Sequence, residues 1–338
     1  MSDPITDITI IGAGPTGLFA SFYAGMRGVS AQLVDALPQV GGQLMALYPE
    51  KLIFDVAGHP EVLAKDLVRS LDAQARRWGQ PRHLGQTVTG LERRDDHYVL
   101  TTTAGAYPTR AIVIAAGIGA FSPRRLPQRA AEPWYGRGID DVVLDPAKYH
   151  GRRVLIIGGG DTAFDWADQL AGKAAHVTLA HRTDRFRAHG ATVDSVNAHA
   201  ASGRVTIHTW HELAEVHDVD GILRGVTLVH TKTKAPVRVD CDAVLPMLGF
   251  VSDMGAIGTW GLTIVNDEIH VNSQMETGVP GLYAAGDVTM YPGKLKLIAT
   301  GFAEAATAVN QAVHWIHPEK KVNPGHSSNL AVFGQKDD

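Results

Sequence analysis

The sequence predicts an α/β protein made of two Rossmann-like, three-layer (ββα) units, with the second unit inserted into the first. A β-branched run, a glycine-rich turn, a helix and a second β-run follow one another at residues 7–35 and again at residues 152–182. Each repeat is followed by a β-rich stretch, and in the second stretch apolar and polar residues alternate. A long helix predicted at residues 297–316 then returns the chain to the first unit.

The first repeat carries the features of a dinucleotide-binding turn. Residues Ile8–Ile11 form a β-branched run typical of a buried parallel strand. In the turn, Gly12 permits the tight bend, Gly14 lets the backbone approach a pyrophosphate, and Gly17 lets the helix pack closely on the strand. The next strand ends at Asp35, whose carboxylate suits the ribose hydroxyls of FAD. A βαβ turn with a purely structural role is the alternative.

The second repeat has a similar turn but a basic ending. Residues 158–163 read GGGDTA, where alanine replaces the third glycine, a change that the motif tolerates. A carboxylate after the next strand would repel a 2′-phosphate, whereas guanidinium groups bind it through charge-assisted hydrogen bonds. We therefore expect NADP(H) rather than NAD(H), and a solvated surface turn is the alternative. The candidate contacts are Gly158, Gly160, Asp161, Thr162, His181, Arg182 and Arg187.

Two dinucleotides in one chain predict hydride transfer between a nicotinamide and a flavin. The flavin performs the chemistry, so no acid or base residue is expected. Cys241 is the one cysteine among 338 residues, so an internal disulfide is excluded, and no CxxC metal knuckle is present. We expect no metal.

Composition and patterning exclude other classes of function. The formal net charge of −4 argues against a nucleic-acid binder, which would normally carry a basic excess. No apolar run approaches the roughly twenty residues of a membrane span. The N-terminus shows no signal peptide, and together with the single cysteine this favours a cytoplasmic location.

The two repeats set the expected domain boundaries. Residues 1–118 and 251–338 are expected to form the FAD-binding domain, with a C-terminal tail, and residues 119–250 the NADP(H)-binding domain. A strand running into Gly286 and Asp287 would place a carboxylate beside a glycine that allows close approach of the backbone. The helix that begins near Leu297 would point its positive end at the flavin.

Several motifs together resemble the two-dinucleotide flavoprotein family that includes the low-molecular-weight thioredoxin reductases. They are GAGPTG, GGQ at residues 41–43, GGGDTA, HRTDRFRA at residues 181–188 and AAGD at residues 284–287. The resemblance implies that GGQ lies along the isoalloxazine, that AAGD contacts the ribityl-phosphate side, and that His181, Arg182 and Arg187 bind the 2′-phosphate. Thr183 stands where the family often has a second arginine.

One departure directs the functional prediction. Residues 140–143 read DDVV where thioredoxin reductases carry their redox cysteines, and these side chains cannot form a disulfide. The chain is more similar to the branch without cysteines, the thioredoxin-reductase-like ferredoxin–NADP⁺ reductases. That resemblance implies a homodimer whose tail covers the partner's flavin. It implies FAD contacts at Thr16, Asp35, Gln43, Tyr48, Val88, Phe121, Asp287 and Ser328.

The predicted activity is electron transfer between NADPH and ferredoxin or flavodoxin. Tyr48 would stack on one face of the isoalloxazine and His326 on the other, although each also fits a structural role. An acidic partner would dock on a basic patch, for which the candidates are Arg124, Arg125, Arg129, Lys294 and Lys296. The alternatives are an NADPH-dependent reductase of quinones, free flavin or an external disulfide protein, and a non-enzymatic redox sensor.

Overall fold

The computed structural model describes residues 4–117, 119–143, 145–329 and 333. The chain forms two compact units, of which the first comprises Met1–Phe121 and Ser252–Asp338 and the second Ser122–Val251. The second unit is therefore an insertion in the first. The two chain crossings lie in strands β9 (Ala120–Pro123) and β17 (Phe250–Asp253), which pair with each other.

The first unit is built on a mixed sheet with the order β5-β2-β1-β8-β7-β6, and β20 also pairs with β8. Five of its strands pair in parallel. Strand β1 pairs with β2 on one side and with β8 on the other, β5 continues the sheet beyond β2, and β20 pairs with β8. The amino-terminal half of β8 pairs antiparallel with β7. The bounds are β1 Thr6–Ile11, β2 Ala31–Asp35, β5 Arg82–Leu84, β6 Val88–Arg93, β7 Tyr98–Thr102, β8 Ala106–Ile114 and β20 Leu282–Ala284.

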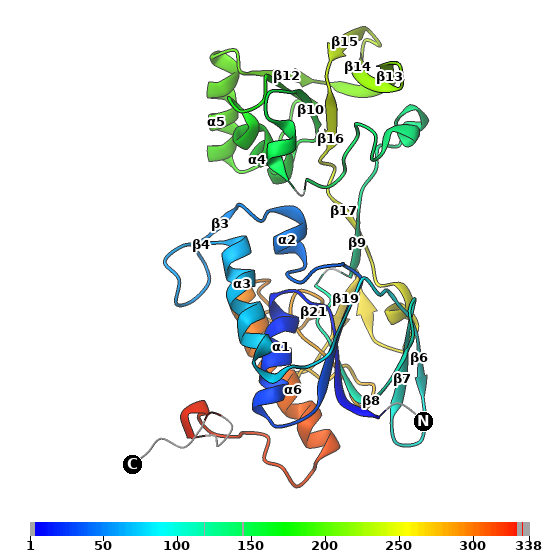
Figure 1. Ribbon diagram of the computed structural model, residues 1–338, viewed down its shortest axis with the longest axis vertical. Helices are drawn as coiled ribbons and strands as arrows, with labels where there is room; N and C mark the ends of the chain where they lie inside the picture. Colours follow the sequence, from blue (N-terminus) through cyan, green and yellow to red (C-terminus); the bar gives the residue numbers. More distant parts are fainter. Residues whose placement is uncertain (1–3, 118, 144, 330–332, 334–338) are drawn as a thin grey trace. The chain divides into compact units, whose positions relative to one another are not determined.

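Three helices cover one face of this sheet, and its strands β6 and β7 lie away from these helices (Figure 1). The helices are α1 (Pro15–Met26), α3 (Ala64–Ala75) and α6 (Ile298–Ile316). Helix α6 packs on α1, with the rings of Phe19 and Phe302 at 5.2 Å between centroids. The C-terminal helix thus completes the core begun by the first hundred residues.

Short elements complete the unit. An apolar stripe that runs from Val62 to Leu71 predicts a helix over residues 61–78. The start of that helix is corrected by the structure, because Val62–Leu63 form strand β4 and pair with β3 at Leu52–Ile53. The helix therefore begins at Ala64, after an extended Leu63. The others are α2 Gln43–Leu47, η1 Arg76–Trp78, η4 Gly255–Thr259, β18 Ile264–Val265, β19 Glu268–His270, β21 Thr289–Met290 and η5 Ser327–Asn329.

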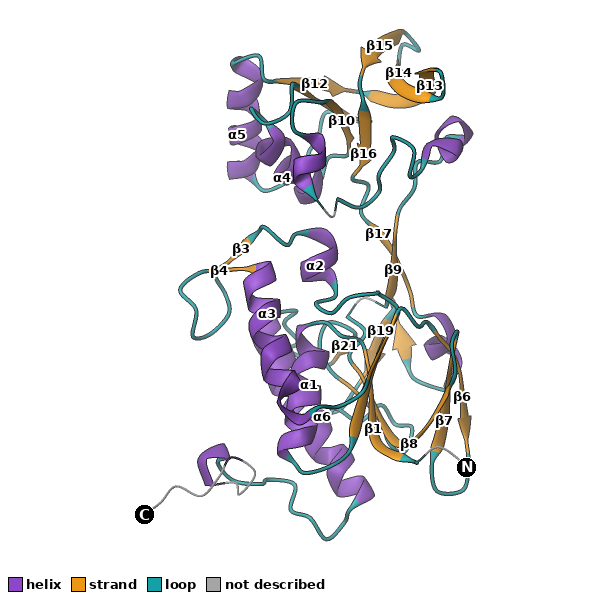
Figure 2. Cartoon of the chain, viewed as in Figure 1, coloured by secondary structure: helices purple, strands orange, loops and turns teal. Residues whose placement is uncertain are grey.

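The second unit repeats the three layers around a parallel sheet with the order β12-β11-β10-β16. Figure 2 shows α4 and α5 on one side of this sheet and the antiparallel strands β13, β14 and β15 on the other. The bounds are β10 Arg153–Ile157, α4 Asp161–Leu170, β11 His176–His181, α5 Gly190–Ala201, β12 Val205–Thr209, β13 His211–Val219, β14 Ile222–His230, β15 Pro236–Asp240 and β16 Ala243–Pro246, with η2 Arg129–Trp134 and η3 Pro146–Tyr149 before them.

Strand β10 explains why this unit needs both outer layers. Val154 and Ile156 belong to the core shared with α4 and α5, whereas Leu155 and Ile157 belong to the core shared with β13–β15. Successive side chains of a strand point to opposite faces, so a continuous β-branched and leucine run must be covered on both. The predicted pair of three-layer α/β units is confirmed.

Candidate functional site

The first glycine-rich turn joins β1 to α1. Gly12 has φ +108°, and a Cβ there would overlap the carbonyl oxygen of Ala115. A Cβ at Gly17 would overlap the carbonyl oxygen of Gly12, whereas a Cβ at Gly14 would meet nothing closer than 4.0 Å. Packing therefore requires glycine at positions 12 and 17, whereas Gly14 leaves open space in front of the helix N-terminus. The N-cap has no side-chain hydrogen bond, so the first N–H groups of α1 are available to an anion.

Asp35, at the end of β2, braces this turn. Its Oδ2 accepts a hydrogen bond from the Ala13 N–H at 2.5 Å, and its Oδ1 accepts one from the Leu37 N–H at 2.7 Å. Burial raises the pKa of the carboxyl group, although the two hydrogen bonds act to lower it. The Gln86 N–H donates to the Asp35 carbonyl at 2.9 Å, which places the chain just before Val88 beside the end of β2.

The GGQ loop lies directly on the first turn. The Gly41 N–H donates to the carbonyl of Ala13 at 2.8 Å, and a Cβ at Gly42 would lie 3.0 Å from the Cα of Gly14. A Cβ at Gly117 would lie 3.2 Å from Nε2 of Gln43. Gln43, a predicted FAD contact, therefore lies between the glycine-rich turn and the segment that follows β8.

Tyr48 and Asp287 lie close enough to affect each other electrostatically. Burial, and then the charge of Asp287, raise the pKa of the Tyr48 hydroxyl. Burial raises the pKa of Asp287, and the charges of Lys294 and Lys296 oppose this shift. These two predicted site residues are 239 positions apart in the sequence but lie in one region of the first unit.

Thr16 joins the first turn to the AAGD segment and to helix α6. A Cβ at Gly286, which has φ +85°, would lie 2.8 Å from the Thr16 hydroxyl oxygen. A Cβ at Gly301, in the first turn of α6, would overlap the same oxygen. The N-termini of α1 and α6 and the Gly286 turn therefore converge. Both helix ends offer unpaired N–H groups, which suits a ligand with phosphate groups and an electron-rich ring.

Two of the predicted residues are not part of this assembly within one chain. His326 and Ser328 are exposed on the tail. Figure 1 shows that tail running past the end of α1 remote from its glycine-rich turn, where Arg27 donates to the carbonyls of Lys321 and Val322, each at 2.8 Å. The side chain of Phe121 lies outside the described residues. The roles of all three stay predictions.

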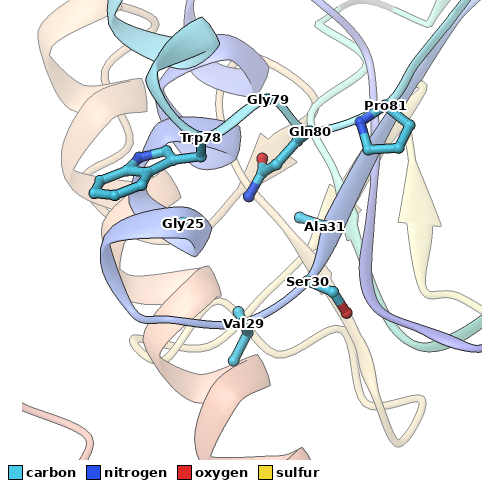
Figure 3. Close-up of a pocket in the computed structure, with 8 residues that line it drawn as sticks. All are labelled: Gly25, Val29, Ser30, Ala31, Trp78, Gly79, Gln80 and Pro81. Carbon is cyan, nitrogen blue, oxygen red and sulfur yellow. The ribbon is translucent and has the colours of Figure 1, made fainter. Parts of the chain in front are cut away.

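A pocket of the first unit lies elsewhere. Figure 3 shows it between Gly25, residues 29–31 and residues 78–81, near the C-terminal end of α1 and the start of β2. Dinucleotides bind at the carboxyl ends of the strands in such sheets. This pocket is therefore separate from the candidate site.

The second turn, between β10 and α4, also contains both crowded glycines and an open one. A Cβ at Gly158 would overlap the carbonyl oxygen of Met247, and one at Gly159 would overlap the imidazole of His181. A Cβ at Gly160 would meet nothing within 4 Å. Here too the helix N-terminus has no side-chain cap, since the N-cap is Gly160. The turn has the form of a second site for phosphate groups.

The basic segment folds back over this second turn. The Arg187 N–H donates to the carbonyl of Gly159 at 2.7 Å, and the His189 N–H donates to Oδ1 of Asp161 at 2.8 Å. Phe186 anchors the segment, with its ring 4.7 Å from that of Phe164. Residues 182–189 are therefore held beside the turn, as a site for a 2′-phosphate requires.

His181 lies under this segment with its ring against Gly159. Burial lowers the pKa of the imidazole, and the positive charges of Arg182 and Arg187 lower it further, although a hydrogen bond from the ring to the backbone of Arg185 opposes them. Thr183, in place of the second arginine of the family, accepts a hydrogen bond from the Arg185 N–H at 3.3 Å and so shapes the loop.

The region that would hold a redox disulfide is built without thiols. Asp140 accepts hydrogen bonds from Lys148 Nζ at 2.7 Å and from the Tyr149 hydroxyl at 2.9 Å, and Val143 is buried. Cys241 is 1% exposed, and burial raises the pKa of its thiol to about 12. Among the described residues no group of three metal-ligating side chains is present. No helix in the described part of the chain is long and apolar enough to span a membrane.

Sequence reasoning missed part of the site and misplaced one residue. Lys294 was a docking candidate, but its side chain is 2% exposed and pairs with Glu304, so that assignment is wrong. Gly301 and Glu304 were not singled out, although a glycine and an acid on the buried stripe of a helix are signals of special packing. Lys296 pairs with Glu268 on the surface.

Fold and site together define a class of protein with two dinucleotide-binding units in one chain. The chain belongs to the pyridine nucleotide-disulphide oxidoreductase family, whose model matches residues 6–312. It is 46% identical to a ferredoxin–NADP reductase of Thermus thermophilus over 97% of this chain and 98% of that one. It is 47% identical to ferredoxin–NADP reductase 2 of Shouchella clausii over 96% and 97%.

Solved structures share the fold at lower identity. The thioredoxin reductase of Lactococcus lactis superposes with a TM-score of 0.75 at 24% identity, covering 92% of this chain and 99% of that one. The bacillithiol disulfide reductase of Staphylococcus aureus gives 0.74 at 16% identity, covering 94% and 99%. These two structures thus share the fold of this chain over nearly its whole length.

Proposed function

We propose that the protein is a ferredoxin–NADP⁺ reductase. The first unit binds FAD and the second binds NADP(H). The observation that carries this is the pair of open turns, one followed by a carboxylate and the other by a basic loop, in a chain without a redox thiol pair. The names of the relatives at 46% and 47% identity support the same activity.

The chain's own residues hold and orient the two nucleotides. At the FAD site, Gly14 and Thr16 at the start of α1 receive the pyrophosphate, and Asp35 receives the ribose, with Val88 beside it. Gln43 and Tyr48 line the ring, with Asp287 toward the ribityl side. Bound FAD supplies the exchange between two-electron and one-electron transfer.

At the NADP(H) site, the open Gly160 and the start of α4 receive the pyrophosphate, with Asp161 and Thr162 in the first turn. Arg182 and Arg187 bind the 2′-phosphate through charge-assisted hydrogen bonds. His181 supports them from below, because its ring packs on the turn itself. The second unit therefore selects NADPH over NADH.

The electron acceptor is ferredoxin or flavodoxin, and an acidic protein of either kind docks on the basic segment at residues 124–129. Arg124 is exposed. Arg125 is half-exposed, lies 4.3 Å from the Tyr135 ring centroid and pairs with Glu132 at 2.9 Å. The variant R124E/R125E should raise the KM for ferredoxin about tenfold and leave ferricyanide reduction unchanged. Equal losses with both acceptors would remove the docking site.

We further infer a cytoplasmic homodimer in which the tail, with His326 and Ser328, covers the flavin of the partner subunit. The exposed position of both residues on the described tail leaves them available to a second chain. Light scattering should give twice the chain mass. Deletion of residues 326–338 should increase the reactivity of reduced flavin with oxygen, and a monomer with unchanged reactivity would contradict the inference.

Anaerobic mixing tests the function. The yellow protein should bleach on addition of NADPH and recover its colour with ferredoxin or flavodoxin. Steady-state rates with quinones, free FMN and thioredoxin should be lower than with ferredoxin. A faster rate with quinone, free flavin or a disulfide protein would favour that alternative, and a flavin that NADPH does not bleach would favour the sensor.

A further inference from the structure

Helix α6 carries a carboxylate into the apolar interior of the first unit. Glu304 is 3% exposed, and the side chain of Lys294 is 2% exposed. Lys294 Nζ donates to the carboxylate oxygens of Glu304 at 2.5 and 2.7 Å, and the Tyr291 hydroxyl donates to Oε1 at 2.6 Å. Two buried charges are weak evidence for stability, because their desolvation opposes their attraction. The contacts of the pair point to another role.

Both halves of the pair bind the backbone of one residue. The Gly286 N–H donates to Oε2 of Glu304 at 2.7 Å. The Gly286 carbonyl accepts from Lys294 Nζ at 3.0 Å and from the Thr289 hydroxyl at 2.8 Å. Since Gly286 adopts φ +85°, its peptide planes have rotational freedom that these contacts remove.

The residue so fixed lies in the proposed FAD site. Gly286 lies against Thr16 of α1 and Gly301 of α6, and Asp287 follows it directly. The pair has no net charge, so it fixes this turn without adding a negative charge beside phosphate groups. A neutral hydrogen-bonding pair would bind the same backbone atoms more weakly.

We propose that Lys294 and Glu304 are positioning residues for FAD: the buried ion pair clamps Gly286 from both sides and so sets the Gly286–Asp287 turn in the conformation that binds the cofactor. This inference rests on the proposed FAD site. Without Lys294 the Glu304 carboxylate stays uncompensated next to the turn, and without the carboxylate the Gly286 N–H loses its acceptor. Both side chains act through the backbone of Gly286, so they are positioning residues and not catalytic residues.

The test compares K294M, E304Q and the double variant K294M/E304Q in the full-length protein, stripped of FAD and titrated back by flavin fluorescence. The matched control is K296M, which removes an exposed lysine whose charge also acts on Asp287. Two further readouts are the Kd for NADP⁺, which reports the second unit, and the urea midpoint of each apoprotein.

FAD should bind at least about tenfold more weakly to K294M, because an unpaired buried charge is left at the turn. The double variant should lose less than the sum of the two single losses. K296M should stay within about twofold of the wild type, and the Kd for NADP⁺ should not change in any variant. If K294M fails to fold, Y291F gives the answer, since it removes one hydrogen bond to Glu304 and should weaken FAD about threefold.

An unchanged FAD affinity in folded K294M and E304Q would overturn the inference, and so would an equal loss in K296M, which would reduce it to an effect of charge at a distance. A lower urea midpoint with unchanged FAD affinity would make the pair merely structural and overturn it as well. A wild-type protein that binds no FAD would instead overturn the proposed function and this inference together.

Discussion

Each of the two glycine-rich turns leads into a helix with a glycine N-cap, but the two turns are held in place by different means. In the first unit the Asp35 carboxylate at the end of β2 binds the turn itself, through the Ala13 N–H. In the second unit no acid stands there, and the loop after β11 binds the turn through backbone groups, from Arg187 to Gly159 and from His189 to Asp161. The group that braces each turn also determines the charge that meets the nucleotide.

This comparison explains why the two sites are not interchangeable. A carboxylate can brace a turn and accept ribose hydroxyls at once, but it repels a 2′-phosphate. A loop braced through its backbone leaves its arginine side chains free to bind that phosphate. Four predictions test this difference and the route of the electrons, in order of decreasing effect.

Gly17 and Gly14 separate the packing role of the first turn from its binding role. G17A should lower the free energy of unfolding by at least about 3 kcal/mol, because its Cβ would overlap the Gly12 carbonyl. G14A has room for its Cβ and should keep the fold but bind FAD more weakly. Urea unfolding and FAD content measure the two effects. A stable G17A protein with full FAD content would contradict the assigned packing.

The basic loop should control the choice of nucleotide. R182A/R187A should lower kcat/KM for NADPH about a hundredfold, since each charge-assisted hydrogen bond contributes about 1.5 kcal/mol or more. The value for NADH should change little. R238A is a control, because Arg238 is a half-exposed arginine of the same unit that pairs with Asp240. Similar losses for NADPH and NADH would mean that the loop does not read the phosphate.

His181 should make NADPH binding depend on pH. Its pKa in the apoprotein is lowered by burial and then by the two arginines, so the unfolded chain holds more protons in the window below about 6.5. Stability from this group is present above that window and lost as the pH falls through the folded pKa.

The 2′-phosphate favours the protonated ring, so binding of NADPH takes up a proton. The affinity for NADPH should rise about threefold from pH 8 to pH 6.5 in the wild type. H181N should abolish this slope, and NADH should show no slope in either protein. Titrations followed by flavin or nucleotide fluorescence measure it, and a persistent slope in H181N would assign the proton to another group.

Cys241 should have no part in electron transfer. C241S should keep the wild-type turnover with ferricyanide and lose only about 1 kcal/mol of stability, because a hydroxyl replaces a buried thiol. Turnover and a thermal melt check both. Loss of turnover in a folded C241S protein would place sulfur on the electron route.

Local patterns predicted the framework of both units. The runs Ile8–Ile11 in β1 and Val154–Ile157 in β10 consist of β-branched residues and leucine and are followed by glycine, so both strands could be placed within two residues and the turns directly after them. The acid and the bases at the ends of β2 and β11 were also visible, because the βαβ unit fixes their distance from the turn.

Interactions between distant residues could not be predicted in this way. Val62 and Leu63 fit a helical stripe, but their pairing with Leu52 and Ile53 makes them a strand. Lys294 lies in a segment, GKLK, that is typical of a solvated loop. Its burial depends on Glu304, ten residues later and on another element, and on Tyr291. The role of His189 as a backbone donor to Asp161 likewise has no local signal.

The place of β20 and α6 in the first unit sets the order in which the chain can mature during synthesis. Strand β20 extends the sheet beside β8, and α6 packs on α1, yet both are translated only after the whole inserted unit. At ribosomal speed the apolar face of α1 must wait on the order of ten seconds for its cover. The inserted unit has all its strands contiguous and can fold first, so the nascent N-terminal segment is the part that needs chaperone protection.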